Sequence, residues 1–184
     1  MTRLIARKIP HRAALLLLAL SPLLAGCGLH PLYAGGTGGV VARNIGSVEI
    51  APIEGKGGWL VRNALQDRLA AISGGNGPHY RLVVKLDDEI MGIGVRPDDA
   101  VTRERRTLRA RYQLFDTATG SVVMDATTGS DVGIDVASSE YATIAAEDTA
   151  LERLSQIVAD QIVLHMARKV ATESTIASGT RQVP

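Results

Sequence analysis

The stretch that decides the fold is Val101–Phe115, with the sequence VTRERRTLRARYQLF. Apolar and charged residues alternate along its second half, which is the period of a β-strand with two different faces. The residues expected to face a core are Leu108, Ala110, Tyr112 and Leu114. The residues expected on the opposite face are Arg103, Arg105, Arg109 and Arg111. This alternation predicts a sheet with one apolar face and one charged face.

Strands with similar alternation are expected on either side of this stretch. They cover residues 79–90 and 121–128, and Gly92-Ile93-Gly94 is expected in the connection after the first. The side chains of Val122, Met124 and Ala126 are expected to point inward. A fourth, short strand is expected over residues 47–53, with Val48 and Ile50 on one face.

Two other segments have helical spacing. One covers residues 59–72, after a break at Gly55–Gly58, and the other starts after Ser138 or Ser139 and runs to about Ala171. The apolar stripes are Val61, Leu65, Leu69 and Ile72 in the first, and Ile144, Leu151, Leu154, Val158, Ile162 and Met166 in the second. The order β-α-β-β-β-α predicts an α+β two-layer sandwich. Its four-stranded, mostly antiparallel sheet carries both helices on one face, with the first two strands parallel.

The N-terminal residues predict export and a lipid anchor. Basic residues precede an apolar run at 13–20, which is too short to span a bilayer but suits a signal peptide. Ala25-Gly26 before Cys27, the sole cysteine, resembles the bacterial lipobox, so Cys27 is the expected lipidation site. The alternatives are an uncleaved membrane anchor and a secreted protein with a free cysteine.

The expected organisation of the chain follows from this anchor. Residues 1–26 form a signal peptide and 27–46 a lipidated N-terminus with a Gly-rich tether. Residues 47–172 form the sandwich domain, and 173–184 form a disordered tail. Loss of the four basic leader residues from the total of 20 leaves 16 against 19 acidic residues, a net charge of −3.

The sequence offers no constellation of catalytic or metal-binding residues, so no enzyme, cofactor or metal is expected. The histidines lack metal-ligand spacing, and there is no Gly-x-Ser-x-Gly or complete P-loop motif. The alternating arginines are the best candidate for a binding site, because guanidinium groups suit phosphate and carboxylate. The alternative is a solvated face neutralised by Asp87, Glu89 and Asp125. Nucleic acid is not the expected partner of an exported, net-acidic domain with few aromatic residues.

The segment Cys27-Gly28-Leu29-His30-Pro31-Leu32-Tyr33 resembles the start of mature lipoproteins of the LptE family. The strand at Val48–Pro52, the helix start at Val61–Leu65 and the element order are also similar to that family. The resemblance implies a non-enzymatic lipoprotein, anchored by fatty-acyl chains such as palmitate in the outer membrane and facing the periplasm.

Members of this family plug the LptD β-barrel, help it assemble and assist lipopolysaccharide transport to the cell surface. Some members bind lipopolysaccharide through basic residues, which by residue type points to Arg103, Arg105, Arg106, Arg109 and Arg111. The 96–99 connection is also expected to contact barrel or lipid. Three other hypotheses are an accessory lipoprotein of an ABC-type envelope lipid transport system, an exported hydrolase and a purely structural envelope lipoprotein.

Overall fold

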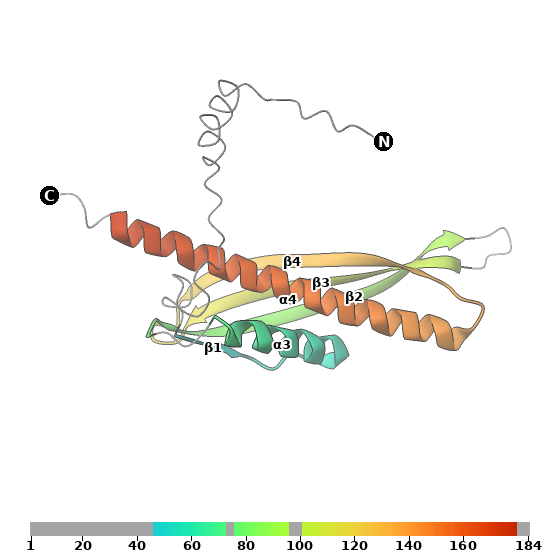
Figure 1. The fold of residues 1–184 in the computed structure, drawn as a ribbon, viewed down its shortest axis with the longest axis horizontal. Coiled ribbons are helices and arrows are strands. Elements are labelled where there is room, and N and C mark those ends of the chain that lie inside the picture. The colour runs from blue at the N-terminus through green and yellow to red at the C-terminus, as the bar shows by residue number, and fades with distance from the viewer. Residues whose placement is uncertain (1–45, 73–75, 96–100, 180–184) are drawn as a thin grey trace, which may run out of the picture. The chain divides into compact units, whose positions relative to one another are not determined.

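A computed structural model describes residues 46–72, 76–95 and 101–179. The leader, Cys27, the tether, the connection at 96–100 and residues 180–184 lie outside the described residues. The elements are β1 (Ser47–Ile50), α3 (Gly55–Ala70), β2 (His79–Val95), β3 (Val101–Asp116), β4 (Val122–Asp135) and α4 (Glu140–Gly179) (Figure 1). The α+β fold and its β-α-β-β-β-α order are therefore as predicted.

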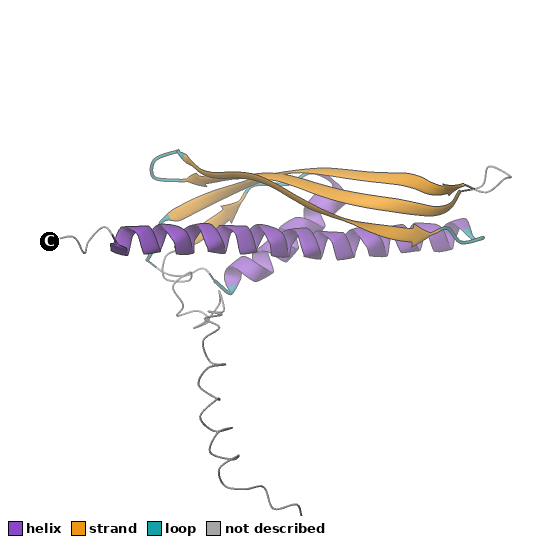
Figure 2. Cartoon of the chain, turned by 90° about the horizontal axis from the view of Figure 1, so that it is seen from above, coloured by secondary structure: helices purple, strands orange, loops and turns teal. Residues whose placement is uncertain are grey.

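The four strands form one sheet in the order β1-β2-β3-β4. β1 runs parallel to β2, because α3 carries the chain back between them, and the other two neighbouring pairs are antiparallel. Both helices lie on the same side of this sheet (Figure 2). The layer arrangement predicted from the single-sided alternation is confirmed.

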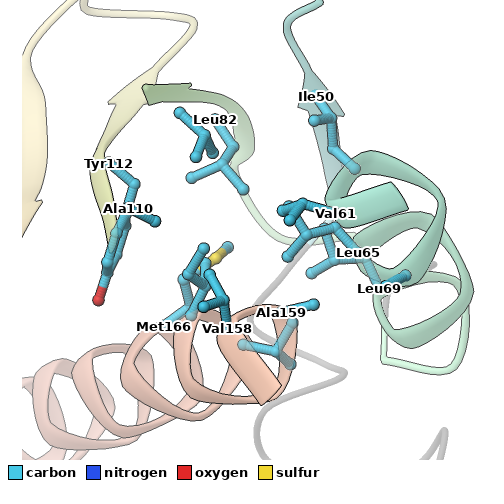
Figure 3. Close-up of a cluster of buried hydrophobic side chains, with 14 of the residues drawn as sticks. Ile50, Val61, Leu65, Leu69, Leu82, Ala110, Tyr112, Val158, Ala159 and Met166 are labelled. Carbon is cyan, nitrogen blue, oxygen red and sulfur yellow. The ribbon is translucent and has the colours of Figure 1, made fainter. Parts of the chain in front are cut away.

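The core lies between the sheet and the two helices. Its sheet side is built on β3, where Leu108, Ala110 and Tyr112 have no exposed surface. Its helix side includes Val61 and Leu65 of α3, which point toward the sheet and α4 (Figure 3). The fully buried α4 side chains include Leu154, Val158, Ile162 and Met166. The apolar stripes predicted for both helices thus form this core, apart from Ile144, which is 49% exposed.

Ion pairs between described residues join α3 to α4 near both ends of α3. Near the start of α3, Lys56 Nζ lies 2.7 Å from Asp148 Oδ1. Near its end, Arg68 donates to Asp160, with 3.0 Å between Nη2 and Oδ2, and this hydrogen bond raises the pKa of the arginine.

Within the described ranges, neither helix combines the length and apolar character that a bilayer crossing requires.

Hydrogen bonds between side chains tie α4 to the sheet at Tyr112 and Thr128. The Tyr112 hydroxyl lies 2.6 Å from His165 Nδ1, and the two rings stack with 6.4 Å between centroids. Thr128 of β4 donates to the Gln161 side chain one turn earlier on α4. Burial raises the pKa of Tyr112. These contacts fix the position of α4 along the sheet, which the apolar core alone would leave less defined.

The start of α3 differs from the prediction, because the glycines expected to break the chain form its first turn. Gly55 has φ +78°, a conformation that glycine adopts without strain. A Cβ on Gly58 would lie 2.6 Å from the carbonyl oxygen of Ile53, so only glycine permits this approach. The low helix propensity of glycine is therefore overridden by close packing.

Two strands are longer than predicted. β2 continues through Gly92 and Gly94, where the register with β3 shifts, and β4 continues from Thr128 to Asp135. A further register shift lies opposite Leu114 and Phe115. It places Val122 on the outer face, 50% exposed, so the prediction that Val122 points inward is wrong.

The end of α4 also differs from the sequence-based boundary. The helix runs to Gly179, so it passes the predicted domain end at residue 172 and includes part of the expected tail. The reason is local, because residues 173–178 contain neither proline nor glycine and an existing helix propagates at low cost.

The buried position of Leu154 generates a prediction about stability. Leu154→Ala is expected to lower the free energy of unfolding by about 2–5 kcal/mol, because it leaves a cavity in the core between the helices and the sheet. Urea unfolding followed by circular dichroism measures this change. The control is Arg153→Ala at the exposed neighbouring position, expected to change stability by about 0.5 kcal/mol or less. Equal losses in the two variants would contradict the packing described here.

Candidate interaction surface

The face of the sheet opposite the helices, here called the open face, carries the polar side chains of β2, β3 and β4. Strand geometry assigns them, because residues at alternate positions project to opposite sides. Along β3, even-numbered residues from Leu108 to Leu114 are buried against the helices. Arg103, Arg105, Arg109 and Arg111 therefore share the open face, as the sequence predicted, and all four are exposed. They are called the arginine ladder below.

Three of the four ladder arginines face aspartates of β4. The cross-strand pairs are Arg103–Asp135 at 3.4 Å, Arg105–Asp131 at 3.6 Å and Arg111–Asp125 at 3.0 Å. Of the three carboxylates predicted to neutralise the ladder, only Asp125 forms such a pair. The other two pairs involve the part of β4 that sequence reasoning did not recognise as a strand. Four arginines in a row are tolerated here because a row of carboxylates lies beside them.

Asp125 has the most complete hydrogen bonding of the three aspartates. Arg111 donates to both of its carboxylate oxygens, at 3.3 and 3.0 Å, and Gln113 donates to Oδ2 at 2.9 Å. The hydrogen bond from Arg111, followed by that from Gln113, lowers the pKa of Asp125. The same contact raises the pKa of Arg111. This pair therefore stays ionised through the neutral and mildly acidic range.

Arg109 differs from the other ladder members, since it forms no ion pair with any described residue. Its neighbour across the β3–β4 pairing is Gly129, which has no side chain. A Cβ on Gly129 would lie 3.1 Å from Arg109 Cγ and 2.9 Å from the Leu108 carbonyl oxygen, so the arginine occupies that space. A shallow hollow of about 290 Å³ lies at this point. It is lined by Thr107, Arg109, Thr127, Thr128, Gly129, Ser130 and Asp131.

The remaining candidate arginine, Arg106, lies apart from the ladder, on the helix side of β3. It is 9% exposed and donates to both oxygens of Asp88, with distances of 2.8 and 2.6 Å. It also donates to the backbone carbonyl of Glu147 on α4, at 2.8 Å. The hydrogen bond to Asp88 raises the pKa of Arg106. Arg106 has an even residue number, as Leu108 does, whereas the four ladder arginines have odd numbers. In a strand this difference alone predicts that Arg106 lies on the other face.

Opposite charges are balanced over the whole open face. By strand register, its described residues include six basic and six acidic side chains. The basic ones are Arg81, Lys85 and the four ladder arginines. The acidic ones are Glu49, Asp87, Glu89, Asp125, Asp131 and Asp135. The face is therefore a pattern of paired charges without a large net charge.

The histidines of the described chain are engaged in separate contacts. His79 lies 2.7 Å from the Ser47 hydroxyl at the start of the sheet, whereas His165 contacts Tyr112 below it. Among the described residues, no group of three or more His, Cys, Asp or Glu side chains is placed to hold a metal ion. The geometry of the open face suits recognition of another charged or polar surface.

Comparison with protein families gives one match. The family model named LptE, described as lipopolysaccharide-assembly, matches residues 45–166, which is more than half of the chain. These residues include the whole sheet and most of α4. A search of curated protein sequences found no match.

Solved structures with the same fold include three bacterial lipoproteins. A putative lipoprotein from Caulobacter crescentus is 29% identical, with a TM-score of 0.55 over 72% of this chain and 93% of that one. A minor lipoprotein from Acinetobacter baumannii is 13% identical, with a TM-score of 0.52 over 66% and 92%. An uncharacterised lipoprotein B from Nitrosomonas europaea is 12% identical, with a TM-score of 0.54 over 73% and 88%. The latter two establish similarity of fold alone.

The different positions of Arg106 and Arg105 predict different effects on stability. Arg106→Ala is expected to lower the free energy of unfolding by about 3 kcal/mol, because it leaves the Asp88 carboxylate without its partner. Arg105→Ala removes only an exposed pair and is expected to change stability by about 1 kcal/mol or less. Urea unfolding of both variants tests the difference. A loss of stability in Arg106→Ala as small as the loss expected for Arg105→Ala would show that Arg106 is not a structural residue.

Proposed function

The chain belongs to the LptE family of lipopolysaccharide-assembly proteins, and from this premise we propose that it is an outer-membrane lipoprotein that plugs an LptD-type β-barrel. In this role it helps the barrel assemble and assists lipopolysaccharide transport to the cell surface. The family match over residues 45–166 is the observation that carries the proposal. The family is not one of enzymes, and the role requires no bond to be made or broken.

The anchor in this proposal is Cys27. The short apolar run and the Ala25-Gly26 pair before this cysteine support cleavage and acylation. Several acyl chains together retain a protein at a membrane surface, whereas one chain gives only reversible binding. The similar Caulobacter crescentus structure is also described as that of a putative lipoprotein. Residues 27–46 then connect the acylated N-terminus to the sandwich domain.

The open face supports a position inside a barrel. The lumen of a large outer-membrane barrel is polar, so a plug must present polar groups to it without a strong uncompensated charge. The open face has this character, because its six basic and six acidic side chains lie close together on a sheet. A pattern of charges on rigid strands favours one orientation of the partner over others.

Within this face, the arginine ladder is proposed to contact the barrel or lipopolysaccharide. Arg109 is the strongest contact candidate, since it forms no ion pair with the described residues and stands beside a hollow. Arg105 is next, because its contact with Asp131 is long, at 3.6 Å, and both side chains are more than half exposed. Arg106 is not part of this proposal, since its guanidinium is bound to Asp88 and α4.

Charge reversal of the ladder tests the contact. Arg105→Glu combined with Arg109→Glu is expected to reduce capture of the barrel about tenfold or more, because like charges across an interface cost several kcal/mol and 1.4 kcal/mol is tenfold. Quantitative pull-down and outer-membrane permeability to a large antibiotic measure the effect. Arg153→Glu with Arg168→Glu, on exposed positions of α4, is the charge-matched control.

The outcomes of this experiment separate two claims. Unchanged capture and permeability in the ladder variant would remove the ladder from the interface. Failure of the wild-type protein to capture a large β-barrel, together with normal surface lipopolysaccharide after its depletion, would contradict the proposed function itself.

Lipidation of Cys27 is tested on the protein purified from membranes. Mass spectrometry is expected to find Cys27 as the N-terminal residue, carrying fatty-acyl chains. Cys27→Ser is expected to move the protein from the membrane fraction to the soluble periplasmic fraction, because the acyl chains provide the anchor. A free thiol or an intact leader in the wild-type protein would contradict the assignment.

A further inference from the structure

From the outer edge of β4 we propose that the sheet accepts a fifth strand, an extended segment of the barrel partner, by β-strand addition. β4 is 14 residues long and is an edge strand, because among the described residues no strand pairs with its other side. Figure 1 shows it along one border of the sheet. This inference rests on the proposed function, and it names the part of the surface that the partner occupies.

The pairing pattern identifies which backbone groups of β4 point outward. Val136 N donates to the Thr102 carbonyl oxygen, and the register from Arg103–Asp135 to Leu114–Met124 has no shift. In an antiparallel pair, hydrogen-bonded positions alternate with positions whose groups point away. The residues of β4 with outward N–H and C=O groups are therefore Asp125, Thr127, Gly129, Asp131, Gly133 and Asp135.

This edge lacks the usual protection against pairing. Edge strands are commonly blocked by lysine, proline or a charge that stands at the edge, whereas Val122–Asp135 contains no lysine, arginine or proline. Its three aspartates are drawn over the sheet toward the arginines of β3. Two of the outward positions, Gly129 and Gly133, have no side chain at all. An unprotected edge of this length is a template for another strand.

The surface beside the edge indicates the chemistry of the added segment. On the helix side, Gln161 contacts Thr128, and Ile157 and Leu164 lie one turn before and after it, half-buried. On the open face, the side chains of Asp131 and Asp135 are 58% and 87% exposed. A segment with apolar residues at alternate positions and basic residues between them matches both sides.

Charge selects between a second copy of the chain and a different partner. A second β4 edge would bring three more aspartates and no basic residue to the contact, so it is a poor match. Strands within a closed barrel wall use their backbone groups on their own neighbours. The added segment is therefore a loop or an extended terminus that leaves the barrel wall.

Amide hydrogen exchange at single-residue resolution tests this proposal. The full-length acylated protein is compared alone and in its co-purified complex with the barrel. In the free protein, the amides of Thr127, Gly129 and Asp131 are expected to exchange fast, and those of Ala126 and Thr128, bonded to β3, slowly. In the complex, the three outward amides are expected to be protected about tenfold or more, because each gains a hydrogen-bond acceptor.

Two variants of one residue provide an independent measurement. Thr127→Pro removes an outward N–H without breaking the β3–β4 ladder, and it is expected to lower capture of the barrel about tenfold. Thr127→Val keeps the N–H and is the matched control, expected to capture the barrel normally. Thermal unfolding of both variants shows whether the fold is retained.

Three results would overturn the proposal, and they differ in what else they affect. A captured barrel with unchanged exchange at the three amides refutes strand addition and leaves the proposed function standing. Protection that appears in the protein alone and rises with its concentration assigns the edge to a second copy. Failure of the wild-type protein to capture a barrel refutes both the occupant named here and the proposed function.

Discussion

The structure depends on the different environments of the two faces of β3. This strand pairs along most of its length with both β2 and β4, so its side chains must suit two opposite surroundings. One face contributes Leu108, Ala110 and Tyr112 to the core, where burial of apolar surface supplies most of the stability. The other face holds the arginine ladder. A shift of the register by one residue would exchange the faces and bury the arginines, so the alternation itself fixes the register.

Polar contacts then determine how α4 lies across this sheet. Apolar packing is non-directional and tolerates sliding of a long helix, whereas hydrogen bonds do not. Among the described residues, Tyr112, Thr128 and Arg106 of the sheet reach α4 with polar groups. They contact it at His165, Gln161 and the Glu147 carbonyl, so the contacts are spread along the helix from residue 147 to residue 165. The bidentate Arg106–Asp88 pair also ties β2 to β3 beside that last contact.

The sequence predicted the core and the layers well, because both rest on hydrophobic periodicity. It was less informative where tertiary contacts decide the structure. The glycines at the start of α3 have poor helix propensity, and the place of Gly58 in the helix is explained only by its close approach to Ile53. The second half of β4 has few apolar residues, so it carries no strand signal of its own and is held by pairing with β3. The position of Val122 on the exposed side of the sheet depends on a register shift that no local sequence pattern encodes.

The same limits apply to the candidate surface. The sequence placed four arginines on one face, and parity alone would have removed Arg106 from that set. It could not find two of the three aspartates that pair with the ladder, because the second half of β4 was not recognised as part of the strand. These pairs change the physical character of the open face. Unpaired positive charges would attract any anion, whereas a pattern of paired charges distinguishes between partners by the positions of their charges. Arg109 is the exception within this pattern, because the diagonal β4 position that supplies Asp131 to Arg105 and Asp125 to Arg111 is occupied by Thr127 for Arg109. A surface of this kind favours a partner that matches its pattern, which is what a plug held in one orientation within a polar lumen requires.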